Sequence, residues 1–300
     1  MASAPPTLFD PAYRRVREDE RFAMSADEYL AAHNVVDYVD DAIRLLAESG
    51  DGAPLDFLAA YFTNVLSGDN VIFRNFAYVQ ATPRNRRSFI RHVRDTFQRF
   101  DANEPTTVAS LHQLLCLLCP DYPIDYVRCA YRIGAVRQRA PADDDDAQVP
   151  GALPFAHFSL HAFLFLYFAE FVRLAAEQFA RVADDDRADA AVNRGALLEA
   201  IVKELVSHRH GQMCAPPTSV LRDVLSRPAR PGSPVDGTTT FDEFCADLFA
   251  DATLPGALLE PRSYAELREG IDRLLESLSL NRSSGTMHRH SKKKGRAAKK

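Results

Sequence analysis

Residues 27–62 contain two short amphipathic segments, and this pair constrains the chain more than any other feature. The first is predicted to be one helix over 27–49, and the second is predicted to begin at Pro54, because proline has no amide proton to leave unpaired in the first helical turn. Helices of this length are marginal alone in water. Each apolar stripe must therefore be buried against the rest of the chain, a second copy or a partner helix. The stripe of the first segment contains Tyr29, Leu30, Val35, Val36, Val39, Ile43 and Leu46.

The composition is that of a folded protein. The chain has 300 residues, which suggests about two domains, and its 19 Phe and 10 Tyr are ample for a buried core. No apolar run approaches the roughly 20 residues that a membrane helix needs, and the first twenty residues contain no apolar signal region, so we expect no membrane partner. Five cysteines, an odd number, favour reduced thiols in the cytoplasm.

Positive charge is concentrated at the C-terminus. Residues 282–300 hold eight Lys and Arg and no acid, and subtracting them from the net charge of −5 leaves −13 on the rest of the chain. This tail has no apolar periodicity and is predicted to be disordered. It suits an anionic partner, a nuclear import receptor or simply a solubilising role. The candidate anion contacts are Lys292, Lys293, Lys294, Arg296, Lys299 and Lys300.

The remaining chain is predicted to be all-α. The helices are expected at 85–100, 107–118, 125–136, 158–183, 188–208, 217–225, 241–250 and 263–280. Helices and loops repeat twice in the same order, over roughly 86–180 and 188–250, which is the layout of paired EF-hands. The predicted organisation is a flexible arm (1–24), a docking-type helix pair (25–68), two degenerate EF-hand-like units (69–183 and 187–256), a C-terminal helix (257–281) and the disordered basic tail (282–300).

The loops of these units lack the oxygen ligands that calcium requires. With Gly232 at loop position 1, Gly237 and Glu243 fall at positions 6 and 12, but Gly232 and Pro234 offer no side-chain oxygen at positions 1 and 3. The loop Asp101–His112 has His112 where the bidentate acid belongs. The sequence therefore predicts helix–loop–helix scaffolds without bound metal.

Metal and catalytic motifs are weak elsewhere. Cys116 and Cys119 with His112 upstream and Cys129 downstream have a spacing that zinc could use, but Cys116 lies among leucines at helical spacing, which favours buried thiols. The chain contains no phosphate-binding glycine loop and no GxSxG motif, and no set of catalytic side chains can be singled out. We therefore expect no enzyme activity and no cofactor.

Two segments carry a resemblance to a known family. The chain resembles the centriolar satellite-associated tubulin polyglutamylase complex regulator family in the segments FRNFAYVQATPRNRRSF and LLCLLCPDYP. The likeness is close over about 27–133 and looser from Phe155 to Phe249, and it does not include the arm or the basic tail.

The resemblance implies a non-catalytic adaptor or regulator. Its expected partners are subunits of the tubulin polyglutamylase complex and microtubules, including the acidic tubulin tails. Its expected location is the cytoplasm and cytoskeleton, at centrosomes, centriolar satellites, basal bodies or cilia. The alternative is a ciliary or axonemal docking protein that holds an amphipathic partner helix without a role in polyglutamylation. A nucleic-acid partner is disfavoured by the acidic body and by the lack of aromatic residues in the tail.

The helix pair is also similar to the dimerisation and docking domain of protein kinase A regulatory subunits. That similarity implies a homodimer in which two copies form a four-helix bundle and grip an amphipathic partner helix. The apolar contacts it implies are Tyr29, Leu30, Val35, Val39, Ile43, Phe57, Leu58 and Phe62.

Overall fold

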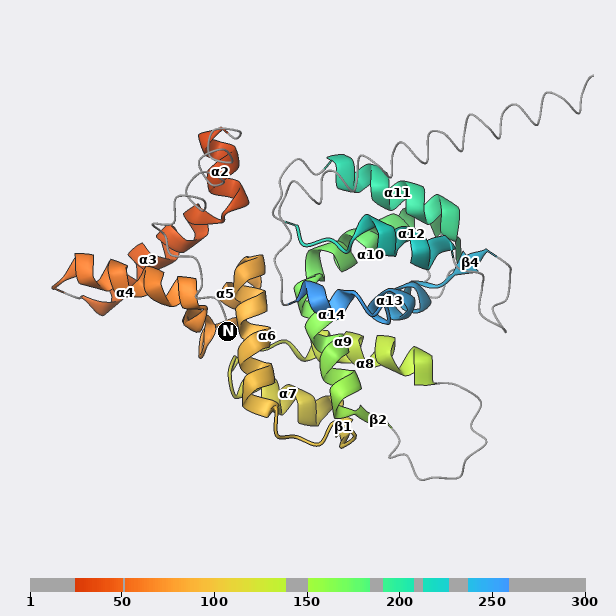
Figure 1. Cartoon of the computed structure of the whole chain (residues 1–300), viewed down its shortest axis with the longest axis horizontal. Helices are drawn as coiled ribbons and strands as arrows, with labels where there is room; N and C mark the ends of the chain where they lie inside the picture. Colours follow the sequence, from red (N-terminus) through yellow and green to blue (C-terminus); the bar gives the residue numbers. More distant parts are fainter. Residues whose placement is uncertain are drawn as a thin grey trace, which may run out of the picture. The chain divides into compact units, whose positions relative to one another are not determined.

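The computed structural model describes residues 25–50, 52–138, 151–183, 191–207, 213–226 and 237–258. These residues are mostly helical, as predicted, with thirteen α-helices and four short strands (Figure 1). Their contacts divide into two compact units, which we call the N-terminal unit (25–67) and the main unit (68–258). The predicted arm, the predicted C-terminal helix from residue 259 onward and the basic tail lie outside the described residues.

The N-terminal unit contains three helices, not the two predicted. They are α2 (Ala26–Ala32), α3 (Val35–Ser49) and α4 (Pro54–Ser67). Ser25 and Glu28 form a capping box that begins α2. The single helix predicted over 27–49 is wrong, because Asn34 adopts a left-handed conformation (φ 52°) that separates α2 from α3. Asparagine tolerates this conformation better than most residues do.

The main unit begins with a short 3-10 helix, Asp69–Val71, and continues through ten α-helices in its described residues. The helices are α5 (Phe76–Ala81), α6 (Pro83–Phe97), α7 (Val108–Cys116), α8 (Ile124–Gln138), α9 (Phe155–Tyr167), α10 (Ala169–Ala183), α11 (Arg194–Ser207), α12 (Thr218–Ser226), α13 (Phe241–Phe249) and α14 (Leu254–Ala257). Several begin at a side-chain cap: Thr82 accepts a hydrogen bond from the Asn85 amide, and Thr107 accepts one from the Ser110 amide.

Short strands pair the loops of the main unit. Strand β1 (Pro105–Thr107) pairs antiparallel with β2 (Ala152–Pro154), with Thr106 opposite Leu153. Strand β3 (Val192–Asn193) pairs antiparallel with β4 (Thr238–Thr239). Each strand leads directly into a helix, α7, α9, α11 and α13 respectively. Two pairs of helix-entry loops are therefore held together by backbone hydrogen bonds that the sequence did not predict.

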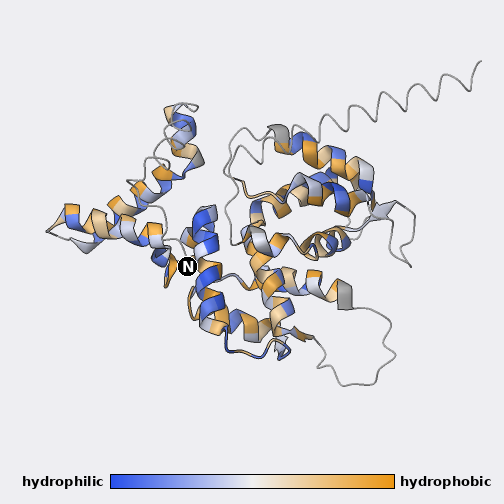
Figure 2. Ribbon diagram, viewed as in Figure 1, coloured by the Kyte–Doolittle hydropathy of each residue, from blue (hydrophilic) through white to orange (hydrophobic). Residues whose placement is uncertain are grey.

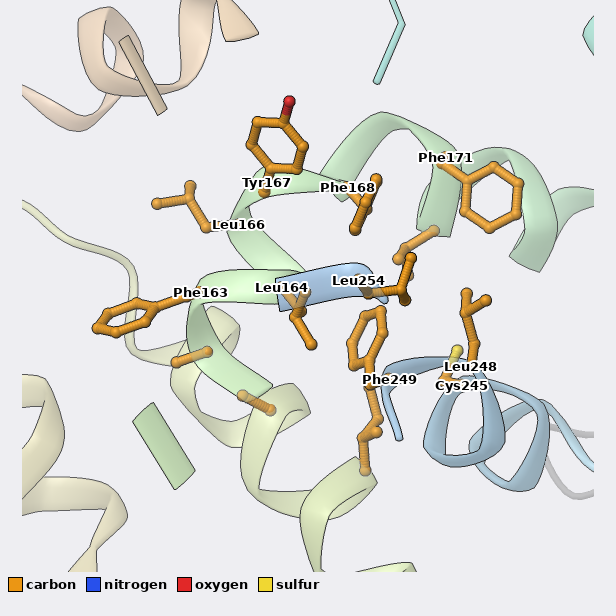
Figure 3. Close-up of a cluster of buried hydrophobic side chains, with 14 of the residues drawn as sticks. Phe163, Leu164, Leu166, Tyr167, Phe168, Phe171, Cys245, Leu248, Phe249 and Leu254 are labelled. Atoms are coloured by element: carbon orange, nitrogen blue, oxygen red, sulfur yellow. The ribbon is translucent and has the colours of Figure 1, made fainter. Parts of the chain in front are cut away.

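One continuous hydrophobic core fills the main unit. Figure 3 shows part of it, where Leu164 of α9, Phe249 of α13 and Leu254 of α14 point toward one another. All three side chains are almost completely buried, as are Phe158 and Phe244. The many aromatic residues of the sequence therefore serve mainly to fill this core.

The long helix predicted over 158–183 is divided in two. Helices α9 and α10 meet at Phe168 with a bend of 80°. Within the described residues no single helix is long and apolar enough to cross a membrane. Helices α9 and α10 taken together have the length and apolar composition of a membrane span, but the bend separates them. Nine of the 13 residues of α9 and six of the 15 residues of α10 are buried in the core.

Polar contacts hold α6 at two points, through Arg86 and through His92. Arg86 is fully buried and forms a two-point ion pair with Glu170 of α10, with nitrogen–oxygen distances of 2.7 and 2.9 Å. At the start of the main unit Gly68 has φ +82°, and a Cβ there would come within 2.5 Å of the Ser88 hydroxyl. The Gly68 carbonyl lies 2.9 Å from His92 Nε2 of α6. Glycine is thus required at 68 both by conformation and by space.

Candidate docking surface on the N-terminal unit

The N-terminal unit has a small core. Among its described side chains, the buried apolar ones are Tyr38, Ala42, Tyr61 and Val65, and Leu45, Phe57 and Leu58 pack against them while partly exposed. Chains shorter than roughly 40 residues rarely bury enough surface to fold without further support. A unit of this size with so few buried side chains gains stability when another surface covers it.

A buried hydrogen bond sets how α3 and α4 pack. Asp41 is only 6% exposed, and its carboxylate accepts a hydrogen bond of 2.8 Å from the Tyr61 hydroxyl. The same carboxylate is paired with Arg44, and this contact raises the pKa of the Arg44 guanidinium. The Asp41 interactions satisfy a charge that would be costly to bury alone.

Large apolar side chains remain exposed on both helices. On α4, Leu55, Phe62 and Leu66 follow one another at spacings of seven and four residues, so they share one face. Leu55 is 79% exposed and Leu66 is 71% exposed. On α3, Val36, Val39 and Ile43 form a second exposed stripe, with Ile43 58% exposed. We call these two stripes the docking surface; Figure 2 shows the apolar residues along both helices.

None of the eight predicted contact residues is fully buried. Leu30, Val39, Ile43 and Phe62 are exposed, and Tyr29, Val35, Phe57 and Leu58 are partly buried. Phe57 and Leu58 face the small core, so they contribute to folding as well as to any docking. Partner binding by these residues stays a prediction. Sequence reasoning omitted Leu55 and Leu66, although their seven- and four-residue spacing from Phe62 was a usable signal.

The candidate calcium loops are occupied by contacts within the protein. The backbone carbonyl oxygens of Ala102 and Glu104 accept hydrogen bonds from the amides of Ala156 and Phe155, at 3.0 and 2.9 Å. Glu243, the predicted ligand at position 12, instead accepts a hydrogen bond from the Thr240 amide in the capping box of α13. The first half of that loop, 232–236, lies outside the described residues.

The candidate zinc ligands do not converge. Among the residues that the structure describes, no group of three His, Cys, Asp or Glu side chains lies where it could hold a metal ion. His112 Nε2 lies 2.7 Å from the Tyr122 carbonyl oxygen and 3.5 Å from the Cys116 sulfur. Burial raises the pKa of Cys119 to about 12 and also raises the pKa values of Cys116 and Cys129. Cys119 is buried, and Cys116 and Cys129 are partly buried, as expected for thiols that pack among apolar side chains.

The predicted anion contacts, Lys292, Lys293, Lys294, Arg296, Lys299 and Lys300, lie outside the described residues. Their role stays a prediction from the sequence.

Comparison with known proteins finds several relatives with one name, centriolar satellite-associated tubulin polyglutamylase complex regulator 1. The Danio rerio protein is 40% identical over 119 residues, which are 38% of this chain and 36% of the relative. The Rattus norvegicus protein is 27% identical over 237 residues, which are 70% of this chain and 69% of the relative. The Bos taurus protein is 34% identical over 162 residues, which are 52% of this chain and 47% of the relative.

The alignments thus span between 36% and 69% of the length of these three relatives. No family model and no solved structure matches the chain. The resemblance drawn from the sequence motifs is confirmed as homology. Over about 70% of its length, this chain is homologous to centriolar satellite-associated tubulin polyglutamylase complex regulator 1.

Proposed function

We propose that this protein is a non-catalytic regulator of a tubulin polyglutamylase complex, acting as an adaptor at centriolar satellites, basal bodies or cilia. The observation that carries the proposal is the homology to proteins named as regulators of that complex. In this proposal a separate subunit adds glutamate to tubulin, and this chain binds and positions that subunit.

The docking surface is the part of the chain best suited to hold a partner. Its exposed side chains are leucine, isoleucine, valine and phenylalanine, and exposed apolar stripes on two helices fit the apolar face of a partner helix. Two copies of the N-terminal unit joined into a four-helix bundle would enlarge the buried core and present one shared groove. The proposal therefore includes a homodimer through α3 and α4.

The main unit then serves as a rigid scaffold. Its strand-paired loops, β1 with β2 and β3 with β4, each precede a helix, and this supports the proposal of two degenerate EF-hand-like pairs without calcium. In the same proposal the basic tail contacts acidic tubulin tails, an interaction that added salt should weaken. Deletion of 282–300 should therefore weaken co-sedimentation with microtubules at low salt. Unchanged co-sedimentation would contradict the proposed contact between the basic tail and tubulin.

Affinity purification of the tagged full chain from ciliated cells tests the proposal directly. We expect mass spectrometry to recover a tubulin polyglutamylase with its accessory subunits. Replacement of Ile43 and Phe62 by Asp should remove them, because both side chains are exposed and part of the docking surface. Leu117→Asp is the matched control, since Leu117 is an exposed leucine of the main unit.

Two results would change the assignment. Recovery of axonemal proteins that contain amphipathic helices, without any ligase subunit, would favour the docking alternative, which the exposed stripes of α3 and α4 support equally well. Equal recovery of the ligase by the wild type and by the Ile43→Asp, Phe62→Asp variant would move the contact away from the N-terminal unit.

A further inference from the structure

The main unit contains an apolar groove with a volume of about 590 Å³. Helices α6, α9 and α14 and the turn after α6 form its walls, and Phe97, Phe100, Leu160, Phe163 and Leu258 line it. Phe100 is 44% exposed and stacks on Phe155 with a ring-centroid distance of 5.3 Å. An open groove with aromatic and leucine walls gains free energy when apolar side chains fill it.

The described chain ends on this groove. Pro255, Gly256 and Leu258 are part of its lining, and Leu258 is the last described residue. The residues that follow contain Tyr264, Leu267, Ile271, Leu274 and Leu278, spaced by three, four, three and four. This spacing predicts one continuous apolar stripe along the helix expected at 263–280.

We propose that segment 263–280 is the occupant of this groove, with its apolar stripe against Phe100, Leu160 and Phe163. The inference concerns the main unit and does not depend on the proposed function. Docking of the segment would also attach the base of the lysine-rich tail to the main unit.

The short connection favours this segment over any separate molecule. Only residues 259–262 separate Leu258 from the predicted helix, and an extended residue spans at most about 3.6 Å. A segment tethered this closely has an effective concentration on the order of millimolar at the groove. A free partner helix or a second copy would have to compete with that concentration.

Charge on the two surfaces is also complementary. Segment 263–280 contains four acidic residues and two arginines. Along α6, Arg84, Arg91 and Arg94 are all exposed, and Arg94 itself lines the groove next to Asp95. The side of α6 visible in Figure 2 is largely hydrophilic. Helix α6 is therefore net basic, which suits the net negative charge of the segment, and of these three arginines Arg94 alone lines the groove.

Hydrogen exchange on the full chain, followed by mass spectrometry, tests the inference. We expect amides of 267–278 in the wild type to exchange about tenfold or more slowly than in Phe100→Asp, which places a charge in the groove. Leu117→Asp, an exposed leucine in the same unit that does not line the groove, should retain the protection. Equal exchange in the wild type and in Phe100→Asp would overturn the inference.

A second pair of variants covers the case in which Phe100→Asp unfolds the main unit. Ile271→Asp changes the apolar stripe, and Glu269→Asp introduces the same residue on the opposite face of the predicted helix. We expect only Ile271→Asp to release 267–278 while α8 and α9 keep their protection. Protection that is unchanged by Ile271→Asp, or that increases with protein concentration and so indicates the segment of a second copy, would contradict docking within one chain.

Discussion

The N-terminal unit and the main unit treat apolar side chains in opposite ways. Among the residues that the structure describes, the main unit buries forty-six of them in one cluster, whereas the N-terminal unit buries four. Of the ten large apolar side chains exposed in the described residues, seven belong to the N-terminal unit. The main unit thus buries its apolar side chains within its own fold, whereas the N-terminal unit leaves most of its large apolar side chains exposed.

The largest expected effect is the loss of unfolding free energy when a cavity is made in the core of the main unit. Phe158 is fully buried and packs edge-to-face against Tyr131, with ring centroids 5.7 Å apart. Phe158→Ala should lower the free energy of unfolding by about 3–5 kcal/mol, measured by urea denaturation. Phe73→Ala, an exposed control in the same unit, should change it by less than about 0.5 kcal/mol. A loss below about 1 kcal/mol for Phe158→Ala would mean that this core is loosely packed.

The second effect comes from the buried ion pair. Glu170→Ala leaves the Arg86 guanidinium buried and uncompensated, which should cost about 3 kcal/mol of unfolding free energy. Replacing both residues together, Arg86→Met with Glu170→Leu, should cost clearly less, because no charge is then buried alone. Equal losses in the single and double variants would show that the ion pair contributes little beyond its packing.

The third effect is a pH dependence of the unfolding free energy of the main unit, which comes from the Cys119 thiol. Cys119 has a pKa of about 12 in the folded protein, raised by burial, against about 8.5 for a free thiol. Between these values the unfolded chain loses the thiol proton and the folded chain keeps it, so stability falls as pH rises. Each unit of pH should remove about 1.4 kcal/mol through this group. Denaturation curves from pH 8 to 11 should therefore fall less steeply for Cys119→Ala, and an unchanged slope would argue against the raised pKa.

The smallest effect concerns the N-terminal unit itself. If a second copy covers α3 and α4, their unfolding midpoint should rise with protein concentration, by mass action. Phe62→Asp should abolish this dependence while changing stability at low concentration by less than about 0.5 kcal/mol, because Phe62 is exposed in the single chain. Hydrogen exchange resolved by segment, at several protein concentrations, would measure the unfolding of α3 and α4 separately from that of the main unit. An unfolding midpoint that does not depend on protein concentration in the wild type would contradict the proposed dimer.

Helices with one apolar stripe and a clear cap could be predicted from the sequence. The predictions at 85–100 and 241–250 correspond to α6 and α13, which begin at the caps Thr82 and Thr240. The break at Asn34 escaped because apolar residues continue at helical spacing on both sides of it. The bend at Phe168 escaped because nearly every neighbouring residue is apolar, so no periodicity marks it. Strands of two or three residues are too short to show alternation.

The candidate site was predictable only in part. The sequence identified α3 and α4 as apolar, but α3 has apolar residues on two faces, one with Tyr38 and Ala42 and the other with Val36 and Ile43. Which of them is buried depends on the Asp41–Tyr61 contact between residues twenty positions apart. Local spacing does not contain that information.

Gly68 has a mechanical consequence. It is the first residue of the main unit, and its carbonyl is held against His92 of α6. The chain that enters the main unit is therefore tied to α6 at its first residue, and the Arg86–Glu170 pair ties α6 to α10.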